Sequence, residues 1–123
     1  KTVGDAIVAV AGLSSHAISP VKSCVDCSFK LREIANSQSM PWNLHLGIHS
    51  GSLVAGTVGT KTVQFDILGK TVNVAFNICD MSESNQILIS SDAWMTVRNE
   101  IKVKSIGLKR LKSGQDIEML ECV

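Results

Sequence analysis

Apolar and polar residues recur along this chain with two spacings, one typical of strands and one of helices. Residues 2–11 form an almost unbroken apolar run with a glycine near its start, which predicts a strand. Residues 43–50 alternate apolar and polar side chains, as a half-buried strand does. Between them, residues 16–37 predict an amphipathic helix, in which Pro20 is tolerated only near the first turn. Its expected buried stripe comprises Ile18, Val21, Cys24, Cys27, Leu31 and Ile34.

The rest of the chain predicts shorter elements. We expect strands at residues 52–58, 62–68, 87–89, 101–106 and 116–122. We expect a helix at residues 70–82, with buried positions at Val72, Ala75, Phe76 and Cys79. A second short helix, capped by Ser90 or Ser91, should turn Trp94 and Val97 inward and end near Asn99. Because strands and helices alternate irregularly, with neighbouring hairpins, the pattern predicts an α+β fold with helices on one face of a largely antiparallel sheet.

Composition narrows the class of protein only slightly. A chain of 123 residues is long enough for one compact domain but not for two. Its net charge of +1 gives no electrostatic reason to expect nucleic acid or an anionic membrane as a partner. No apolar run approaches the roughly 20 residues that a membrane helix needs, so we expect no direct membrane contact from this segment.

The four cysteines admit two interpretations. An even number in a short chain is compatible with disulfides, and the Cys24-x-x-Cys27 spacing is compatible with metal or redox chemistry. However, both residues fall on the apolar stripe, where cysteine commonly behaves as a small buried hydrophobe, and no second close pair completes a zinc set. We therefore predict free core thiols, which fit a reducing compartment. The expected location is the cytoplasm, where the chain could also be the intracellular domain of a larger or membrane-attached protein.

Three polar residues stand out from their surroundings. Asp5 lies inside an apolar run, where a carboxylate must be paired, hydrated or bound to a cation. It is therefore either a magnesium ligand or a strand-end residue open to water. Asn73 and Asn77 follow the turn at Gly69 and are four residues apart, so on a helix they project from one face and can both reach one ligand. The alternative is that both are ordinary solvent-facing positions.

Six segments of the chain, in order and spacing, resemble the catalytic domain of class III nucleotide cyclases, the adenylate and guanylate cyclases. They are Lys1-Thr2-Val3-Gly4-Asp5-Ala6, Gly12-Leu13, Leu46 to Gly51, Val54 to Gly59, Gln64 to Gly69 and Thr71 to Ala75. The resemblance runs from the first residue almost to the last and implies the ferredoxin-like fold of that family. The family's domain opens with a further strand and helices that carry the first of two metal aspartates. We therefore expect residues 1–123 to be an N-terminally truncated catalytic domain with an uncovered sheet edge, which invites pairing with another chain.

The resemblance also implies roles for individual residues. Asp5 matches the second metal aspartate, and magnesium or manganese is the implied cofactor, in a site for two metal ions. Lys1 and Asp66 match the pair that reads the purine. A lysine donor and an aspartate acceptor complement N1 and the 6-amino group of adenine, whereas guanine inverts that pattern. Guanylate cyclases carry an acidic residue and a cysteine at these positions, so ATP is the expected substrate. Asn73 matches the asparagine that orients the ribose.

The phosphate side of the implied site departs from the family pattern. Lys112, in the segment Leu111 to Gly114, matches a lysine that binds the triphosphate, although Ser113 stands where a glycine is usual. Asn77 stands where the family has an arginine aimed at the phosphates in the transition state, and Phe76 replaces a small residue before it. Asparagine has no charge and no bidentate fork for phosphate. Loss of such a contact typically costs about 10²–10⁴ in rate.

In this family the active site lies between two catalytic domains, so the resemblance implies a dimer. A homodimer would have two equivalent sites, and a heterodimer could take the missing arginine from its partner. We expect Lys1 and Asp66 to meet across a subunit boundary around an adenine ring. The expected function is adenylate cyclase activity, converting ATP to 3′,5′-cyclic AMP and pyrophosphate. The alternative is a catalytically weak domain that serves as a dimerisation or nucleotide-sensing half. An RNA-binding sheet is disfavoured because the chain has three Phe and no Tyr.

Overall fold

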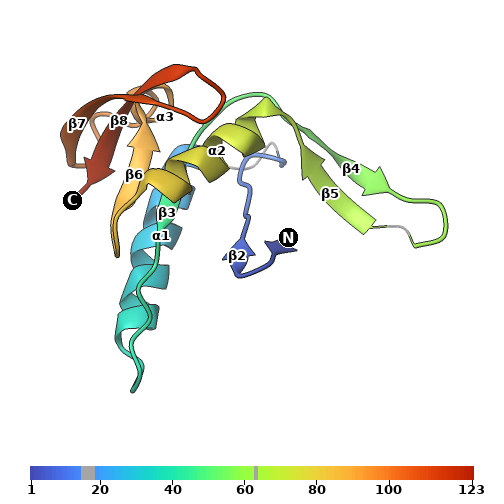
Figure 1. Cartoon of the computed structure of the whole chain (residues 1–123), viewed down its shortest axis with the longest axis horizontal. Coiled ribbons are helices and arrows are strands. Elements are labelled where there is room, and N and C mark those ends of the chain that lie inside the picture. The colour runs from blue at the N-terminus through green and yellow to red at the C-terminus, as the bar shows by residue number, and fades with distance from the viewer. Residues whose placement is uncertain (15–18, 63) are drawn as a thin grey trace.

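The computed structural model describes residues 1–14, 19–62 and 64–123, arranged as one four-stranded sheet with helices against it and two separate hairpins (Figure 1). The elements in chain order are β1 (Thr2–Val3), β2 (Ala6–Ile7), α1 (Pro20–Asn36), β3 (Leu46–Ile48), β4 (Val54–Val58), β5 (Gln64–Leu68), α2 (Lys70–Met81), β6 (Ile87–Ser90), α3 (Ser91–Met95), β7 (Val103–Arg110) and β8 (Asp116–Cys122). The hairpin of β4 and β5 projects away from the sheet in Figure 1.

The four-stranded sheet has the order β3-β6-β8-β7 and is mostly antiparallel, with one parallel pair between β3 and β6. This confirms the predicted α+β class with an antiparallel-rich sheet. Every residue of β6 is buried, as expected of a strand covered on both faces. Val21 and Val25 of α1 pack with Ile87 and Ile89 on one face, together with α3. On the other face, α2 packs against Leu88 and its neighbours, so the helices divide between the two faces instead of sharing one.

Gly47 of β3 allows the close packing of α2. A Cβ atom at this position would lie 2.4 Å from the backbone nitrogen of Cys79 and 2.9 Å from the carbonyl oxygen of Ala75. Both distances are shorter than an ordinary contact between a carbon atom and another heavy atom. The missing side chain therefore lets the helix backbone rest directly on the strand, and this contact positions α2 relative to the sheet.

The N-terminal strand predicted at residues 2–11 is instead a tight hairpin. β1 and β2 pair antiparallel around Gly4 and Asp5, and Gly4 has a φ of +60°, which glycine adopts without the strain that other residues meet. Residues 8–11 continue beyond β2 without regular secondary structure. The apolar run is therefore interrupted at its glycine, and Asp5 lies at the exposed hairpin tip and not inside a strand.

The predicted helices all form, with shifted boundaries. Ser19 caps α1 by accepting a hydrogen bond from the backbone of Lys22, and Pro20 occupies the first turn as expected. The predicted start at residues 16–18 lies outside the described residues, as does residue 63 of the strand predicted at 62–68. Ser90 caps α3, as predicted, by accepting from the backbone nitrogen of Ala93, but this helix ends at Met95. The strand predicted at 101–106 extends to Arg110.

The predicted buried stripes of both long helices were only partly right. On α1, Val21 is buried, but Leu31 and Ile34 are about half exposed and Cys27 is exposed. Val25 and Ser28 are buried instead. On α2, Val72 is buried as predicted, but Val74 and Ile78 provide the main core contacts, and the other predicted members are only half-buried: Ala75, Phe76 and Cys79.

Many of these displaced apolar residues line a common groove. Its volume is about 400 Å³, and it lies between residues 6–11, α1, β3 and α2. α1 contributes Cys24, Cys27 and Leu31, and α2 contributes Ala75, Phe76 and Cys79. β3, which also lines it, is an edge strand of the sheet in the described part of the chain. The helical periodicity thus identified an apolar face on each of the two long helices, but much of that face borders the groove and not the main core.

All four cysteines are free thiols, as predicted. Only Cys122 lies fully in the core, so the prediction of core thiols is wrong for exposed Cys27. Burial raises the pKa of Cys122 to about 11 and also raises the pKa of Cys24 and of Cys79. No helix in the described ranges has both the length and the apolar character needed to span a bilayer.

Candidate functional site

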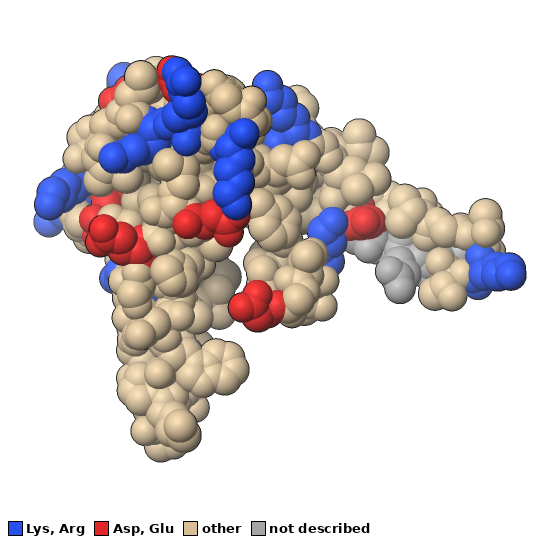
Figure 2. Space-filling view, in the orientation of Figure 1, with Lys and Arg blue, Asp and Glu red and all other residues tan. Residues whose placement is uncertain are grey.

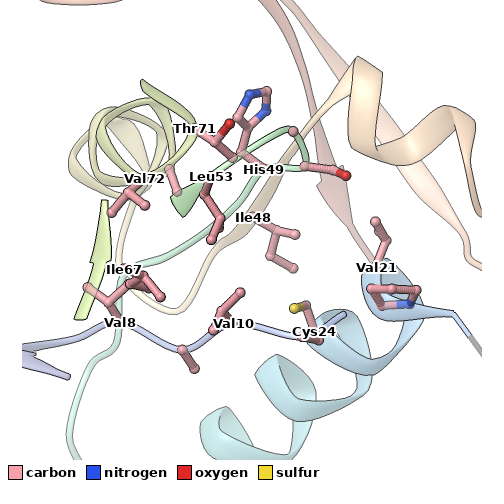
Figure 3. Close-up of a pocket in the computed structure, with 16 residues that line it drawn as sticks. Val8, Val10, Val21, Cys24, Ile48, His49, Leu53, Ile67, Thr71 and Val72 are labelled. Carbon is pink, nitrogen blue, oxygen red and sulfur yellow. The ribbon is translucent and has the colours of Figure 1, made fainter. Parts of the chain in front are cut away.

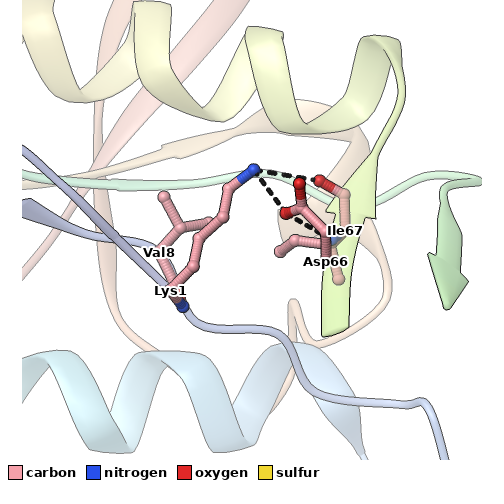
Figure 4. Close-up of polar contacts among 4 residues, drawn as sticks. All are labelled: Lys1, Val8, Asp66 and Ile67. Atoms are coloured by element: carbon pink, nitrogen blue, oxygen red, sulfur yellow. Dashed lines mark hydrogen bonds and ion pairs between the residues drawn. The ribbon is translucent and has the colours of Figure 1, made fainter. Parts of the chain in front are cut away.

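An ion pair between distant parts of the chain joins Lys1 to Asp66 (Figure 4). The ammonium nitrogen lies 2.7 Å from Oδ1 of Asp66 and 3.2 Å from the carbonyl oxygen of Ile67. The same carboxylate oxygen accepts a hydrogen bond of 2.8 Å from the backbone nitrogen of Ile67. The hydrogen bond from Lys1, followed by that from Ile67, holds the pKa of Asp66 below its usual value. Asp66 is therefore ionised at neutral pH.

This pair forms within one chain, which corrects the expectation that its members meet across a subunit boundary. Lys1 directly precedes β1, and Asp66 is on β5, so the contact ties the N-terminal hairpin to the β4–β5 arm. The side chains remain 29% and 26% exposed, respectively. An ammonium group has three N–H donors and a carboxylate has two acceptor oxygens. The contacts in the described structure use two of the donors and one of the oxygens, so the pair can still offer a donor and an acceptor to a ligand.

A small hollow is lined in part by Ile67, the residue that follows Asp66 (Figure 3). Its volume is about 100 Å³, and its mostly apolar lining includes Val8, Val10, Ile48 and Ile67. Pockets that bind drug-sized ligands typically measure roughly 300–1,000 Å³. Neither this hollow nor the larger groove is lined by Lys1 or by the asparagines of α2. The described surfaces of a single chain therefore do not enclose a nucleotide beside its candidate ligands.

Asp5 lies at the tip of the β1–β2 hairpin, exposed to solvent. Across residues 1–14, 19–62 and 64–123, no cluster of three or more His, Cys, Asp or Glu side chains is arranged to hold a metal ion. Magnesium is commonly bound by one or two carboxylates together with water and substrate phosphates. Asp5 suits one such ligand position, but the described residues form no complete set of ligands around it.

The two asparagines of α2 differ in what their side chains offer. The helix begins after Gly69, whose φ of +140° is readily adopted only by glycine. Asn73 lies one turn later and is exposed. Asn77 is half-buried, and its amide nitrogen donates a hydrogen bond of 2.9 Å to the carbonyl oxygen of Asn73. Position 77 therefore presents no charge, and its amide is already bonded to its own helix.

Lys112 reaches α2 from the turn between β7 and β8. Leu111 anchors this turn by being buried, and backbone hydrogen bonds from Leu111 to Gln115 and from Gly114 to Leu111 close it. The ammonium nitrogen of Lys112 lies 3.4 Å from Oδ2 of Asp80 on α2. The sequence reasoning missed Asp80, although its spacing of three residues from Asn77 already placed it on the same side of the helix.

The structure thus assembles the predicted residues into separate groups. Lys1 and Asp66 form the first group, at the junction of the hairpin and the arm. Asn73, Asn77 and Lys112 gather along α2, joined by Asp80. Asp5 stands apart at its hairpin tip. Figure 2 shows Lys and Arg side chains gathered over β7 and β8 in that view, at the same end of the molecule as the turn that carries Lys112.

Comparison with known families and proteins finds nucleotide cyclases. The sequence profile of the adenylate and guanylate cyclase catalytic domain matches residues 1–120. Soluble guanylate cyclase gcy-31 of Caenorhabditis elegans is 30% identical over 125 residues, which cover 97% of this chain and 17% of that protein. The aggregation-specific adenylate cyclase of Dictyostelium discoideum is 29% identical over 129 residues, covering 96% of this chain and 9% of that protein. The chain therefore spans less than a fifth of the length of these two relatives.

Solved structures with a similar fold include cyclases of both kinds. The guanylate cyclase domain of RhGC from Catenaria anguillulae, in complex with GTP, matches with a TM-score of 0.81 and 18% identity, over 89% of this chain and 63% of that chain. The adenylyl cyclase CyaB from P. aeruginosa also matches with a TM-score of 0.81, at 20% identity, over 93% of this chain and 64% of that chain. At such identities the likeness concerns the fold.

Proposed function

Because the chain belongs to the adenylate and guanylate cyclase catalytic domain family, we propose that it forms part of an adenylate cyclase that converts ATP to 3′,5′-cyclic AMP and pyrophosphate. Its relatives include cyclases for both nucleotides, so family membership does not choose the purine. The observation that supports adenine is the contact of 2.7 Å between Lys1 and Asp66. It places a fixed cationic donor beside a fixed anionic acceptor.

Adenine recognition follows from the order of these two groups. Adenine presents an acceptor at N1 and a donor at its 6-amino group, side by side on one edge of the ring. The unused N–H of Lys1 would donate to N1, and the free oxygen of Asp66 would accept from the amino group. Guanine presents a donor and an acceptor at these positions in the reverse order. Guanine bound in the same orientation would place a donor against the Lys1 donor and an acceptor against the Asp66 acceptor. This costs affinity because buried polar groups then stay unpaired.

The reaction joins the ribose 3′-hydroxyl to the α-phosphorus and releases pyrophosphate. We assign the orientation of the ribose to Asn73, which is exposed on α2, and the binding of the triphosphate to Lys112. Asp5 would supply one ligand to Mg²⁺ or Mn²⁺ in a site completed by other groups, and such an ion lowers the cost of deprotonating the hydroxyl. Positioning and electrostatic stabilisation carry most reactions of this kind.

We propose that a second cyclase domain completes the site. The hollow lined in part by Ile67, at about 100 Å³, is too small to enclose ATP. The exposed asparagine, lysine and aspartate positions also need an opposing surface that excludes water. A homodimer supplies two equivalent copies of the site. A heterodimer could in addition supply an arginine in place of Asn77.

One observation favours a second candidate function, that of a catalytically weak, nucleotide-sensing or dimerising half. Asn77 carries no charge, and its amide nitrogen is already bonded at 2.9 Å to the backbone of Asn73. Asn77 therefore supplies no positive charge to stabilise the phosphate oxygens in the transition state. A homodimer built from such chains would lack this contribution in both sites.

Measurement of cyclic AMP formation from ATP with Mn²⁺ separates the two functions. The full-length protein is compared with an Asn77→Arg variant, with Lys61→Glu as a control for a change of charge on the exposed β4–β5 turn. Robust activity of the parent supports the cyclase, with the missing charge supplied from elsewhere. An inactive parent with an active Asn77→Arg variant supports the weak, sensing half.

The choice of purine has its own test. A double variant, Lys1→Glu with Asp66→Cys, exchanges the donor and acceptor and should move preference from ATP towards GTP. The comparison is the ratio of affinities for the two nucleotides, which does not require catalysis. An unchanged ratio would refute the assignment of Lys1 and Asp66 to the purine.

A further inference from the structure

Asp80 occupies an unexpected place in the proposed site. It follows Asn73 by seven residues and Asn77 by three, so it continues the same face of α2. Its carboxylate lies 3.4 Å from the ammonium nitrogen of Lys112, the one residue on this side of the site to which we assign triphosphate binding. A carboxylate therefore accompanies the cation at the position where the polyphosphate of the nucleotide would lie.

We propose that Asp80 sets the specificity of this site by weakening its hold on the triphosphate, through its pairing with Lys112. The inference rests on the proposed function. ATP must displace the carboxylate from Lys112 before the ammonium can bind a phosphate oxygen, and the carboxylate also repels the incoming charge. The site consequently gains most of its affinity from the adenine and the ribose, and the number of phosphates contributes little.

The local balance of charge supports this inference. Lys112 and Asp80 cancel, and Asn77 contributes no charge. On the neighbouring strands, Arg110 is likewise paired with Asp116, with 3.0 Å between Nε and Oδ1. These two ion pairs therefore contribute no net positive charge to the phosphate side of the site. Lys112 and Asp80 are respectively 80% and 56% exposed, so solvent screens their pairing and the effect is moderate, not absolute.

The test compares binding of ATP and adenosine to the full-length protein by calorimetry. Asp80→Asn should tighten ATP binding about three- to tenfold and leave adenosine binding unchanged, because adenosine carries no phosphate. Asp26→Asn is the matched control, since it removes another exposed helix carboxylate that pairs with a lysine, on α1, which carries no residue of the proposed site. It should leave the ratio of the two affinities unchanged.

A third variant tests the route through the lysine. In a Lys112→Met background, Asp80→Asn should no longer tighten ATP binding to the same extent, because the cation it would release is gone. An undiminished gain in that background would overturn the pairing mechanism. Equal tightening of ATP and adenosine would overturn the assignment of Asp80 to phosphate specificity.

The inference and the proposed function fail in different ways. If the parent binds ATP and Asp80→Asn leaves that affinity unchanged or weaker, the inference is refuted while the proposed function stands. If neither ATP nor adenosine binds the parent or any variant, the proposed function is refuted and the inference falls with it. Asp80 is an exposed helix position, so Asp80→Asn should fold normally, and thermal unfolding checks that it does.

Discussion

Gly47→Ala should displace α2 from the sheet and reveal how tightly the helix is positioned. The new Cβ would lie 2.4 Å from the backbone nitrogen of Cys79, about 1 Å short of an ordinary contact. The obstructing atoms belong to the helix backbone, so rotation of a side chain cannot relieve the clash. Overpacking of this kind typically costs about 1–3 kcal/mol, which is a large share of the 5–15 kcal/mol that stabilise a domain.

The same displacement has a consequence for activity under the proposed function. Asn73 is carried by α2, so a shift of the helix by about 1 Å moves the residue assigned to the ribose. A misplacement of that size can cost about 10²-fold in rate. We therefore expect Gly47→Ala to reduce turnover about a hundredfold, beyond any loss that comes from partial unfolding at the assay temperature.

Chemical denaturation followed by circular dichroism measures the stability change, and Gly56→Ala provides the matched control. Gly56 is also a strand glycine, but a Cβ built on it meets no atom within 4 Å. Its replacement should change the free energy of unfolding by less than about 1 kcal/mol. Equal stability of the two variants would refute the claim that the helix backbone rests on Gly47.

Three other predictions concern stability and reactivity. Ile78→Ala should destabilise the fold by about 2–5 kcal/mol in denaturant titrations, because this side chain is 0% exposed in the core; a change below 1 kcal/mol would contradict its core role. The lowered pKa of Asp66 means that its contribution to stability is complete above the ordinary carboxyl pKa of about 4 and is lost as the pH falls through the folded-state pKa. Asp66→Asn should therefore flatten the acid side of the pH–stability curve, and identical curves would exclude this linkage. Cys27, which is exposed, should react with a thiol reagent at pH 8 in the folded protein, whereas Cys122, buried and with a pKa of about 11, should react only after unfolding; mass spectrometry of the labelled peptides distinguishes them.

The helical pattern predicted where α1 and α2 lie but not which side of each faces the sheet. α2 is apolar around most of its circumference, with Val74 and Ile78 towards the sheet and Ala75, Phe76 and Cys79 towards the groove. Periodicity cannot rank two apolar faces, because both satisfy the same spacing rule. The choice depends on contacts with β6 and β8, which are distant in sequence.

The N-terminal hairpin was missed for a different reason. Its two strands have only two residues each, so the apolar run continues through the turn and resembles one longer strand. Gly4 was the available signal, since glycine beside aspartate is a frequent turn dipeptide. The positive φ of Gly4 is a turn conformation, so the glycine permits the turn and does not lie inside a strand.

The candidate site required information that local pattern does not carry. Lys1 and Asp66 are 65 residues apart, and only the family resemblance suggested that they act together. The resemblance did not extend to Asp80, whose partner Lys112 is 32 residues away and belongs to a different element. Contacts of this kind depend on the packing of the β7–β8 turn over α2, which is a property of the whole fold.

The two sides of the proposed site differ in what they can contribute to catalysis. The purine side has an ordered donor and acceptor, Lys1 and Asp66, held by a short contact. The phosphate side has an uncharged Asn77 and a lysine already paired with Asp80. Purine contacts are equally strong in the ground state and the transition state, so they lower KM without raising kcat. Charge at the phosphates is what raises kcat, and the two residues at positions 77 and 112 supply little of it. Under the proposed function, the chain is therefore better equipped to recognise adenine than to accelerate cyclisation. A partner domain that contributes positive charge at the phosphates would raise kcat.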